Sequence, residues 1–215
     1  TAFLPEEPPL SWMLPSSITH TSVFSSVWLW QPNRSTLGDR LKAKDRDYAG
    51  GFGVHASTDL TFVLPSSAKG FRSWVALDPS AGQGGCVNLA VLAEGNRGLF
   101  QRDALVGAQD PIDTGWLNWN PGTVKSLTLR ADMARDNRPA KADPFDIRDI
   151  TNWCAPTLQL DPLTLAKDVA AAQQRRGVVL PGWSLSEGDA ASILLKSVFD
   201  STDTRDLRFR KVLRT

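Results

Sequence analysis

Several tryptophans stand beside polar residues in short turn-like segments, and this combination of side chains suits the recognition of sugars. An aromatic ring can pack on the C–H face of a pyranose, while Asp, Asn, Arg or His side chains hydrogen-bond to its hydroxyls. Trp119 lies between two asparagines, and Trp30 directly precedes the turn QPNR. Each indole has an alternative role, because tryptophan is also a large core residue. The candidate ligand-binding residues of these two segments are Trp30, Asn33, Arg34, Asn118 and Trp119.

Three further polar residues complete the candidate ligand-binding set: His55, Asp78 and Arg148. His55 is one of two histidines in the chain and falls in a short predicted strand. Its structural alternative is a buried imidazole, hydrogen-bonded to Asp78 or Asp149, that holds the edge of a sheet. Both interpretations remain open at the level of the sequence.

The segment ADPFDIRD places three carboxylates at intervals of three residues: Asp143, Asp146 and Asp149. Carboxylates gathered on a loop suit Ca²⁺, which takes six to eight oxygen ligands. The spacing differs from that of an EF-hand loop. The alternative is that these residues cap and brace the loop, with Arg148 pairing locally. We therefore expect either a calcium site or a loop held by internal hydrogen bonds.

The motifs of common enzyme classes are missing from the sequence. It contains no GxSxG, HExxH, paired CxxC or P-loop segment. A glycosidase needs two opposed carboxylates, and glutamate occurs only four times. We expect a protein that is not an enzyme, with a hydrolase that uses an Asp pair as the remaining catalytic alternative.

Bulk composition is that of an ordinary globular protein. The chain has 215 residues, 41% of them hydrophobic, and a formal net charge of +1. Because the charge is close to zero, no strong field favours nucleic acid. No apolar run approaches the roughly 20 residues of a membrane span. Cys86 and Cys154 either pair or lie buried as separate thiols.

Apolar residues alternate over several short segments separated by Gly- and Pro-containing turns, which indicates an all-β sandwich or barrel. The predicted strands cover 22–30, 51–56, 59–65, 71–78, 86–95, 123–132 and 152–161. In the third of these, Leu60, Phe62 and Leu64 share one face. Residues 1–21 are Pro-rich and predict an extended N-terminal arm.

The pattern becomes helical after Asp161, which with Pro162 resembles an N-cap and first turn. Leu165, Val169 and Ala172 follow at helical spacing. We expect residues 162–215 to form a helical C-terminal extension that can contact other domains or subunits.

The middle of the chain resembles the NPCBM domain (novel putative carbohydrate-binding module), which is related to the family 51 carbohydrate-binding modules. Four blocks carry the resemblance in the family's order: GGFGVHASTDLTFVL (50–64), FRSWVALD (71–78), GGCVNLAVLAEG (84–95) and DPFDIRDITNWCAPTL (143–158). The similarity extends over about 22–161.

The resemblance implies a galactose-binding-like jelly-roll β-sandwich in a secreted, periplasmic or cell-surface protein. It implies a non-catalytic module that binds a glycan at the loop end of the sandwich. The alternative is a structural or protein-interaction module of a surface assembly that has no sugar ligand.

Overall fold

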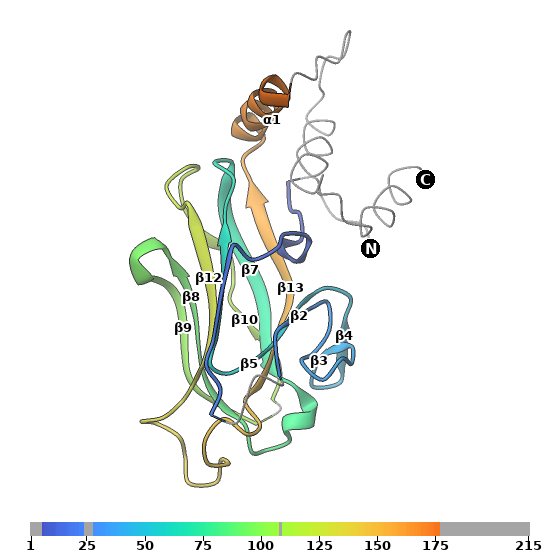
Figure 1. The fold of residues 1–215 in the computed structure, drawn as a ribbon, viewed down its shortest axis with the longest axis vertical. Coiled ribbons are helices and arrows are strands. Elements are labelled where there is room, and N and C mark those ends of the chain that lie inside the picture. Colours follow the sequence, from blue (N-terminus) through green and yellow to red (C-terminus); the bar gives the residue numbers. More distant parts are fainter. Residues whose placement is uncertain (1–5, 24–27, 108, 177–215) are drawn as a thin grey trace.

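A computed structural model describes residues 6–23, 28–107 and 109–176 (Figure 1). Its strands are β1 (Ser17–His20), β2 (Gln31–Pro32), β3 (Leu41–Ala43), β4 (Arg46–Tyr48), β5 (Gly51–His55), β6 (Thr58–Val63), β7 (Ala68–Leu77), β8 (Cys86–Ala93), β9 (Arg97–Val106), β10 (Ile112–Asp113), β11 (Leu117–Asn118), β12 (Ser126–Met133) and β13 (Ile150–Leu160). Its helices are the 3-10 turns η1 (Leu10–Trp12), η2 (Pro79–Ala81) and η3 (Glu94–Asn96), and the α-helix α1 (Pro162–Arg176). Within this part of the chain, no helix is long and apolar enough to span a bilayer.

The strands form two antiparallel sheets that face each other. One sheet has the order β1-β6-β12-β8-β9, and the other has the order β10-β7-β13-β5-β2, with β11 also paired to β7. Inward-facing residues alternate with outward-facing ones, and Leu60 and Phe62 are fully buried as the period-2 pattern predicts. Phe52 and Phe62 join the sheets, with ring centroids 5.2 Å apart. The predicted all-β sandwich with a C-terminal helix is therefore confirmed.

The outer side of the six-stranded sheet carries a second, smaller apolar cluster. The hairpin β3-β4 packs Leu41 and Tyr48 against Ala76 and Cys154, with Trp74 partly buried beside them. Cys154 and Cys86 are both buried and both free, so the alternative of separate thiols is the correct one.

Helix α1 extends the core beyond the end of β13. The Asp161 carboxylate accepts hydrogen bonds from the Thr164 backbone N–H at 2.9 Å and from its hydroxyl at 2.8 Å, as an N-cap does. Leu165 and Val169 are buried in the main core. The remainder of the predicted helical extension, residues 177–215, lies outside the described residues.

The structure differs from the sequence-based expectation near the N-terminus. Residues 6–20 are part of the sandwich: Leu10 is fully buried, and β1 forms the edge of the five-stranded sheet beside β6. The strand expected over 22–30 is wrong for the described residues of that segment, which lie outside any strand. Val23 and Leu29 are about half exposed there.

Candidate functional site

The residues selected from the sequence fall in separate parts of the molecule. One group lies at the end of the sandwich where β5 and β7 finish and β13 begins, which we call the loop end (Figure 1). It contains His55, Asp78 and the segment 143–149. Asn118 and Trp119 lie near the opposite end, where β13 finishes and α1 begins, which we call the helix end. Asn118 pairs with Gly70, eight residues before Asp78 on the β7 path, or roughly 26 Å at strand spacing.

Trp119 at the helix end is half-buried. Its indole Nε1 donates to the Ala68 carbonyl at 2.8 Å, and the ring packs against the core. The Asn118 side chain donates to the Trp116 carbonyl at 3.4 Å. These contacts close the end of the sandwich and leave Trp119 far from the polar residues of the loop end.

Trp30, Asn33 and Arg34 form a third group, beside the start of β5. Trp30 is half-buried against the core, with its ring centroid 6.3 Å from that of Phe52. The side-chain oxygen Oδ1 of Asn33 accepts from the Gly51 N–H at 3.1 Å, and the Arg34 side chain donates to the Gly38 carbonyl at 2.8 Å. The polar side chains of this group are thus engaged in local bonds that shape the turn.

His55 is fully buried at the loop end, and its ring lies 4.8 Å from that of Trp28. Neither ring nitrogen has a hydrogen-bond partner among the described residues, so the expected bond to Asp78 or Asp149 is wrong. Asp78 instead accepts from Ser80 and Asn152. Burial lowers the pKa of His55, and the charge of Asp146 opposes this shift.

The three aspartates of the segment 143–149 have separate partners. Asp143 pairs with Arg148 at 2.9 Å, Asp146 accepts from Ser22 and from the Val23 N–H, and Asp149 pairs with Arg138. Among the residues that the structure describes, no group of three or more His, Cys, Asp or Glu side chains is arranged to hold a metal ion. Calcium binding here stays a prediction.

The Asp149 carboxyl is held in a buried environment. It is fully buried, accepts from the Cys86 N–H at 2.7 Å and pairs with Arg138. Burial outweighs these favourable contacts and raises its pKa to about 6. The side chain ties the start of β8 to the start of β13 and lies out of reach of a ligand.

Phe145 is a candidate that sequence reasoning missed. Its side chain is 53% exposed, and its backbone has a φ of +59°, a left-handed conformation that is strained for a bulky residue. The following residue, Asp146, is buried and fastens the loop to Ser22 and Val23. A signal existed in the sequence, because the segment DPFD places one aromatic residue between two aspartates in a turn-like stretch.

Arg148 stands three residues beyond Phe145 on the same loop and presents a polar group to solvent. Its side chain is about half exposed, and its Nε is 2.9 Å from the Asp143 carboxylate. A guanidinium has five N–H donors, so this single contact leaves others for a ligand. The loop thus carries an exposed ring together with an exposed ion pair.

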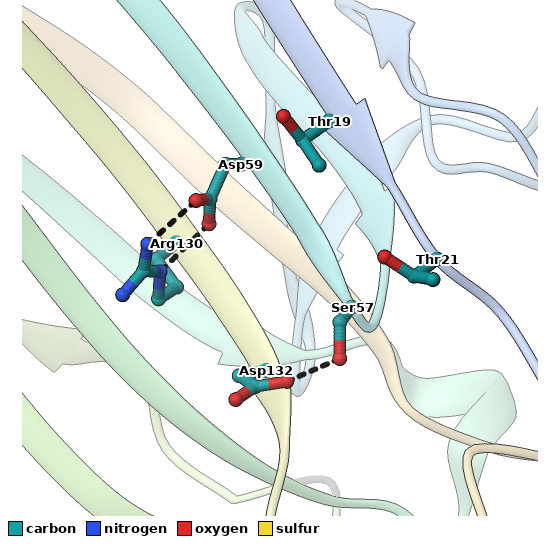
Figure 2. Close-up of a pocket in the computed structure, with 6 residues that line it drawn as sticks. All are labelled: Thr19, Thr21, Ser57, Asp59, Arg130 and Asp132. Carbon is teal, nitrogen blue, oxygen red and sulfur yellow. Dashed lines mark hydrogen bonds and ion pairs between the residues drawn. The ribbon is translucent and has the colours of Figure 1, made fainter.

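A polar depression lies on the outer face of the five-stranded sheet, beside the turn that joins β5 to β6 (Figure 2). Its volume is about 200 Å³. The residues that line it are Thr19, Thr21, Ser57, Asp59, Arg130 and Asp132. None of them was selected from the sequence, because they come from strands that meet only in the folded sheet.

Comparison with known proteins identifies the family. The family model described as the NPCBM/NEW2 domain matches residues 13–159. The chain belongs to the NPCBM family. The match includes β1, consistent with the place of that strand in the sheet of the NPCBM sandwich. No protein of curated function matches the sequence.

Solved structures similar to this NPCBM domain include CBM51 modules of Clostridium perfringens. The CBM51 of GH95, in complex with methyl-galactose, has 16% identity and a TM-score of 0.58, over 71% of this chain and 99% of that one. CBM51-2 with the INT domains of ZmpB, in complex with GlcNAc, has 16% identity and a TM-score of 0.60, over 89% of this chain and 45% of that one. A structure of the ZmpB M60 catalytic domain with two CBM51 domains has 16% identity and a TM-score of 0.58, and the chain spans 15% of its length. At this identity the likeness shows the fold.

Proposed function

We propose that the protein is a non-catalytic carbohydrate-binding module that holds a glycan at its loop end. The observation that carries the proposal is the exposed ring of Phe145, on a loop that also presents the Arg148–Asp143 pair. The ring would pack on the C–H face of a pyranose, and the ion pair would hydrogen-bond to its hydroxyls. Membership of the NPCBM family and the CBM51 fold support this function.

The non-catalytic part of the proposal is supported by the state of the carboxyls at the loop end. Asp149 has the raised pKa of a general acid, but it is fully buried and bonded to Arg138. Asp78 is almost fully buried and bonded to Ser80 and Asn152. A glycosidase needs two carboxyls that both reach the substrate, and these two do not.

The module would work outside the cytoplasm, in a secreted or cell-surface protein. Its role would be to keep a larger assembly near a glycan-bearing target, where several weak sites acting together raise the overall affinity. The solved relatives include CBM51 domains in one chain with a catalytic domain, which supports such a role.

The test is a calorimetric titration with methyl-galactose and N-acetylglucosamine, followed by a glycan array. We expect weak binding of at least one glycan and a loss of about tenfold in affinity for Phe145→Ala, because the stacking surface is removed. Leu163→Ala, which removes a 74% exposed side chain at the helix end, is the matched control and should bind as the wild type does. No binding across the array, or equal affinity in both variants, would contradict the proposal.

A protein partner is the second candidate for this surface. Val23 and Ile147 are 49% and 39% exposed, and the Asp146 carboxylate bonds the Val23 N–H, so the two segments that carry these apolar residues and Phe145 are joined. An exposed apolar group of this kind also suits a protein contact. A Phe145→Ala variant that lost a protein partner in the parent assembly while no glycan bound the wild type would favour this alternative.

A further inference from the structure

The polar depression of Figure 2 is formed by outward-facing side chains of three neighbouring strands. Thr19 on β1 lies opposite Asp59 on β6, and Asp59 lies opposite Arg130 on β12. Ser57 and Asp132 lie one step nearer to the loop end. The lining contains no aromatic ring, so a ligand bound here would be recognised by hydrogen bonds and charge alone.

The positive and negative side chains that line the depression do not cancel in charge. Arg130 donates from Nε and Nη2 to the Asp59 carboxylate at 2.8 and 2.7 Å, which neutralises both groups. Asp132 is a second carboxylate, and its Oδ1 accepts from the Ser57 hydroxyl and the Met133 N–H. Its Oδ2 has no hydrogen-bond partner among the described residues. Two carboxylates against one guanidinium leave a formal charge of −1.

The hydrogen-bonding groups of the depression that have no partner among the described residues define which ligands can bind. One carboxylate oxygen is available as an acceptor, and the hydroxyls of Thr19 and Thr21 can donate or accept. A volume of about 200 Å³ equals roughly seven waters, which is room for one sugar ring and less than a drug-sized ligand needs. Anionic sugars would be repelled by the net charge, whereas an ammonium offers three donors and the complementary charge.

We propose that the polar depression is a second binding site, separate from the loop end, that selects a sugar unit with a free ammonium group through Asp132. The threonine hydroxyls and the guanidinium hydrogen-bond to the ring hydroxyls, and Asp132 Oδ2 accepts from the ammonium. An N-acetylated sugar lacks the charge and keeps only one of the three N–H donors, so it binds more weakly at this site.

The first experiment is an NMR titration at pH 6 with glucosamine, N-acetylglucosamine, glucose and glucuronic acid. Glucosamine should bind at least about fivefold more tightly than N-acetylglucosamine, because charge-assisted hydrogen bonds are about twice as strong as neutral ones. Its chemical-shift changes should centre on Thr19, Ser57 and Asp132, and glucuronic acid should bind most weakly. Equal affinity for the charged and acetylated sugars, or shifts centred elsewhere, would overturn the proposal.

The second experiment compares Asp132→Asn with Asp103→Asn. Asparagine at position 132 keeps an acceptor for Ser57 but removes the charge, so the preference for glucosamine should disappear. Asp103 is an exposed carboxylate on β9 of the same sheet, bonded to Gln101 and outside the depression, and its replacement should leave the preference intact. Identical behaviour of the two variants would refute the role of Asp132.

The Phe145→Ala variant separates this proposal from the one made for the loop end. It should lose the glycan of the loop end and keep the preference for glucosamine in the depression. If Phe145→Ala abolished both activities, the depression would not be an independent site. If glucosamine alone failed to bind the wild type, the loop-end function would stand without the second site.

Discussion

The helix end and the loop end of the sandwich close the same core with different side chains. At the helix end, the Trp119 ring packs on the core with its indole N–H satisfied, and α1 adds Leu165 and Val169 to the buried cluster. At the loop end, the buried polar atoms without partners include both ring nitrogens of His55 and Asp146 Oδ1. Phe145 stays exposed there in a strained conformation. Apolar packing dominates the helix end, whereas the loop end combines unpartnered polar atoms of His55 and Asp146 with the strained backbone of Phe145.

The difference indicates a division of labour within one module. Unpartnered buried polar groups and strained backbone each cost stability, and they tend to persist at functional sites. Among the described residues, the helix end has one such group, the buried Ser67 hydroxyl, beside its apolar packing. We therefore expect substitutions at the helix end to change stability and substitutions at the loop end to change binding.

The largest effect is expected from Leu165→Ala at the helix end. Leu165 is 1% exposed, and its truncation leaves a cavity in the main core. The free energy of unfolding should fall by about 3 kcal/mol. Urea unfolding measures the loss, and calorimetry should show unchanged glycan affinity. A weakened glycan affinity with unaltered stability would reverse the assignment of the two ends.

An intermediate effect is expected from the titration of Asp149 at the loop end. Its pKa of about 6 in the fold lies above the roughly 3.9 of an unfolded chain, so its contribution favours the native state at low pH and is lost as pH rises. Between pH 4 and 6 the loss is about 2 kcal/mol. His55, whose pKa is lowered by burial, acts in the opposite sense and contributes stability that is lost on acidification.

The variant Asp149→Asn isolates these two contributions. Without the Asp149 titration, the effect of His55 is no longer offset, so stability should fall more steeply on acidification than in the wild type. Urea unfolding at pH 4, 5, 6 and 7 measures both slopes, and His55→Asn should change the slope in the other direction. Parallel pH profiles for wild type and Asp149→Asn would show that burial does not raise this pKa.

The smallest effect is expected from a comparison of Phe145→Gly with Phe145→Ala. Both variants remove the ring and should lose glycan affinity equally. Glycine adopts a φ of +59° without strain, so it should be more stable than the alanine variant by about 1 kcal/mol. Thermal unfolding gives the difference. Equal melting temperatures would show that the loop stores no strain at this position.

The local alternation of apolar and polar residues predicted most of the long strands. β6, β7, β12 and β13 alternate between the core and the outer face over several residues, and this periodicity is visible in the sequence. The N-cap at Asp161 was also predicted, because capping depends on residues close in the chain. Strand β9 was missed: its pairing with β8 contains register shifts, half of its residues are exposed and only one is buried, so no period appears.

The candidate site was predictable only in part. The resemblance pointed to the loop end, but the partners of Asp149 lie at Cys86 and Arg138, which are distant in sequence. The depression combines residues 19–21 and 57–59 with Arg130 and Asp132, so only the strand order places them together. Trp30 and Trp119 were selected by residue type, and their half-buried positions depend on tertiary packing.

The N-terminal residues pair with the end of β13, and this pairing determines at which end of the sandwich the module can be attached to a neighbouring domain or a surface. The Glu6 carbonyl accepts from the Leu160 N–H, so the chain enters the sandwich beside the point where α1 leaves it. Ile150, at the other extremity of the same strand, lies roughly 33 Å away. Immobilisation on a sensor surface through either flank would consequently leave the Phe145 loop pointing into the bulk solution.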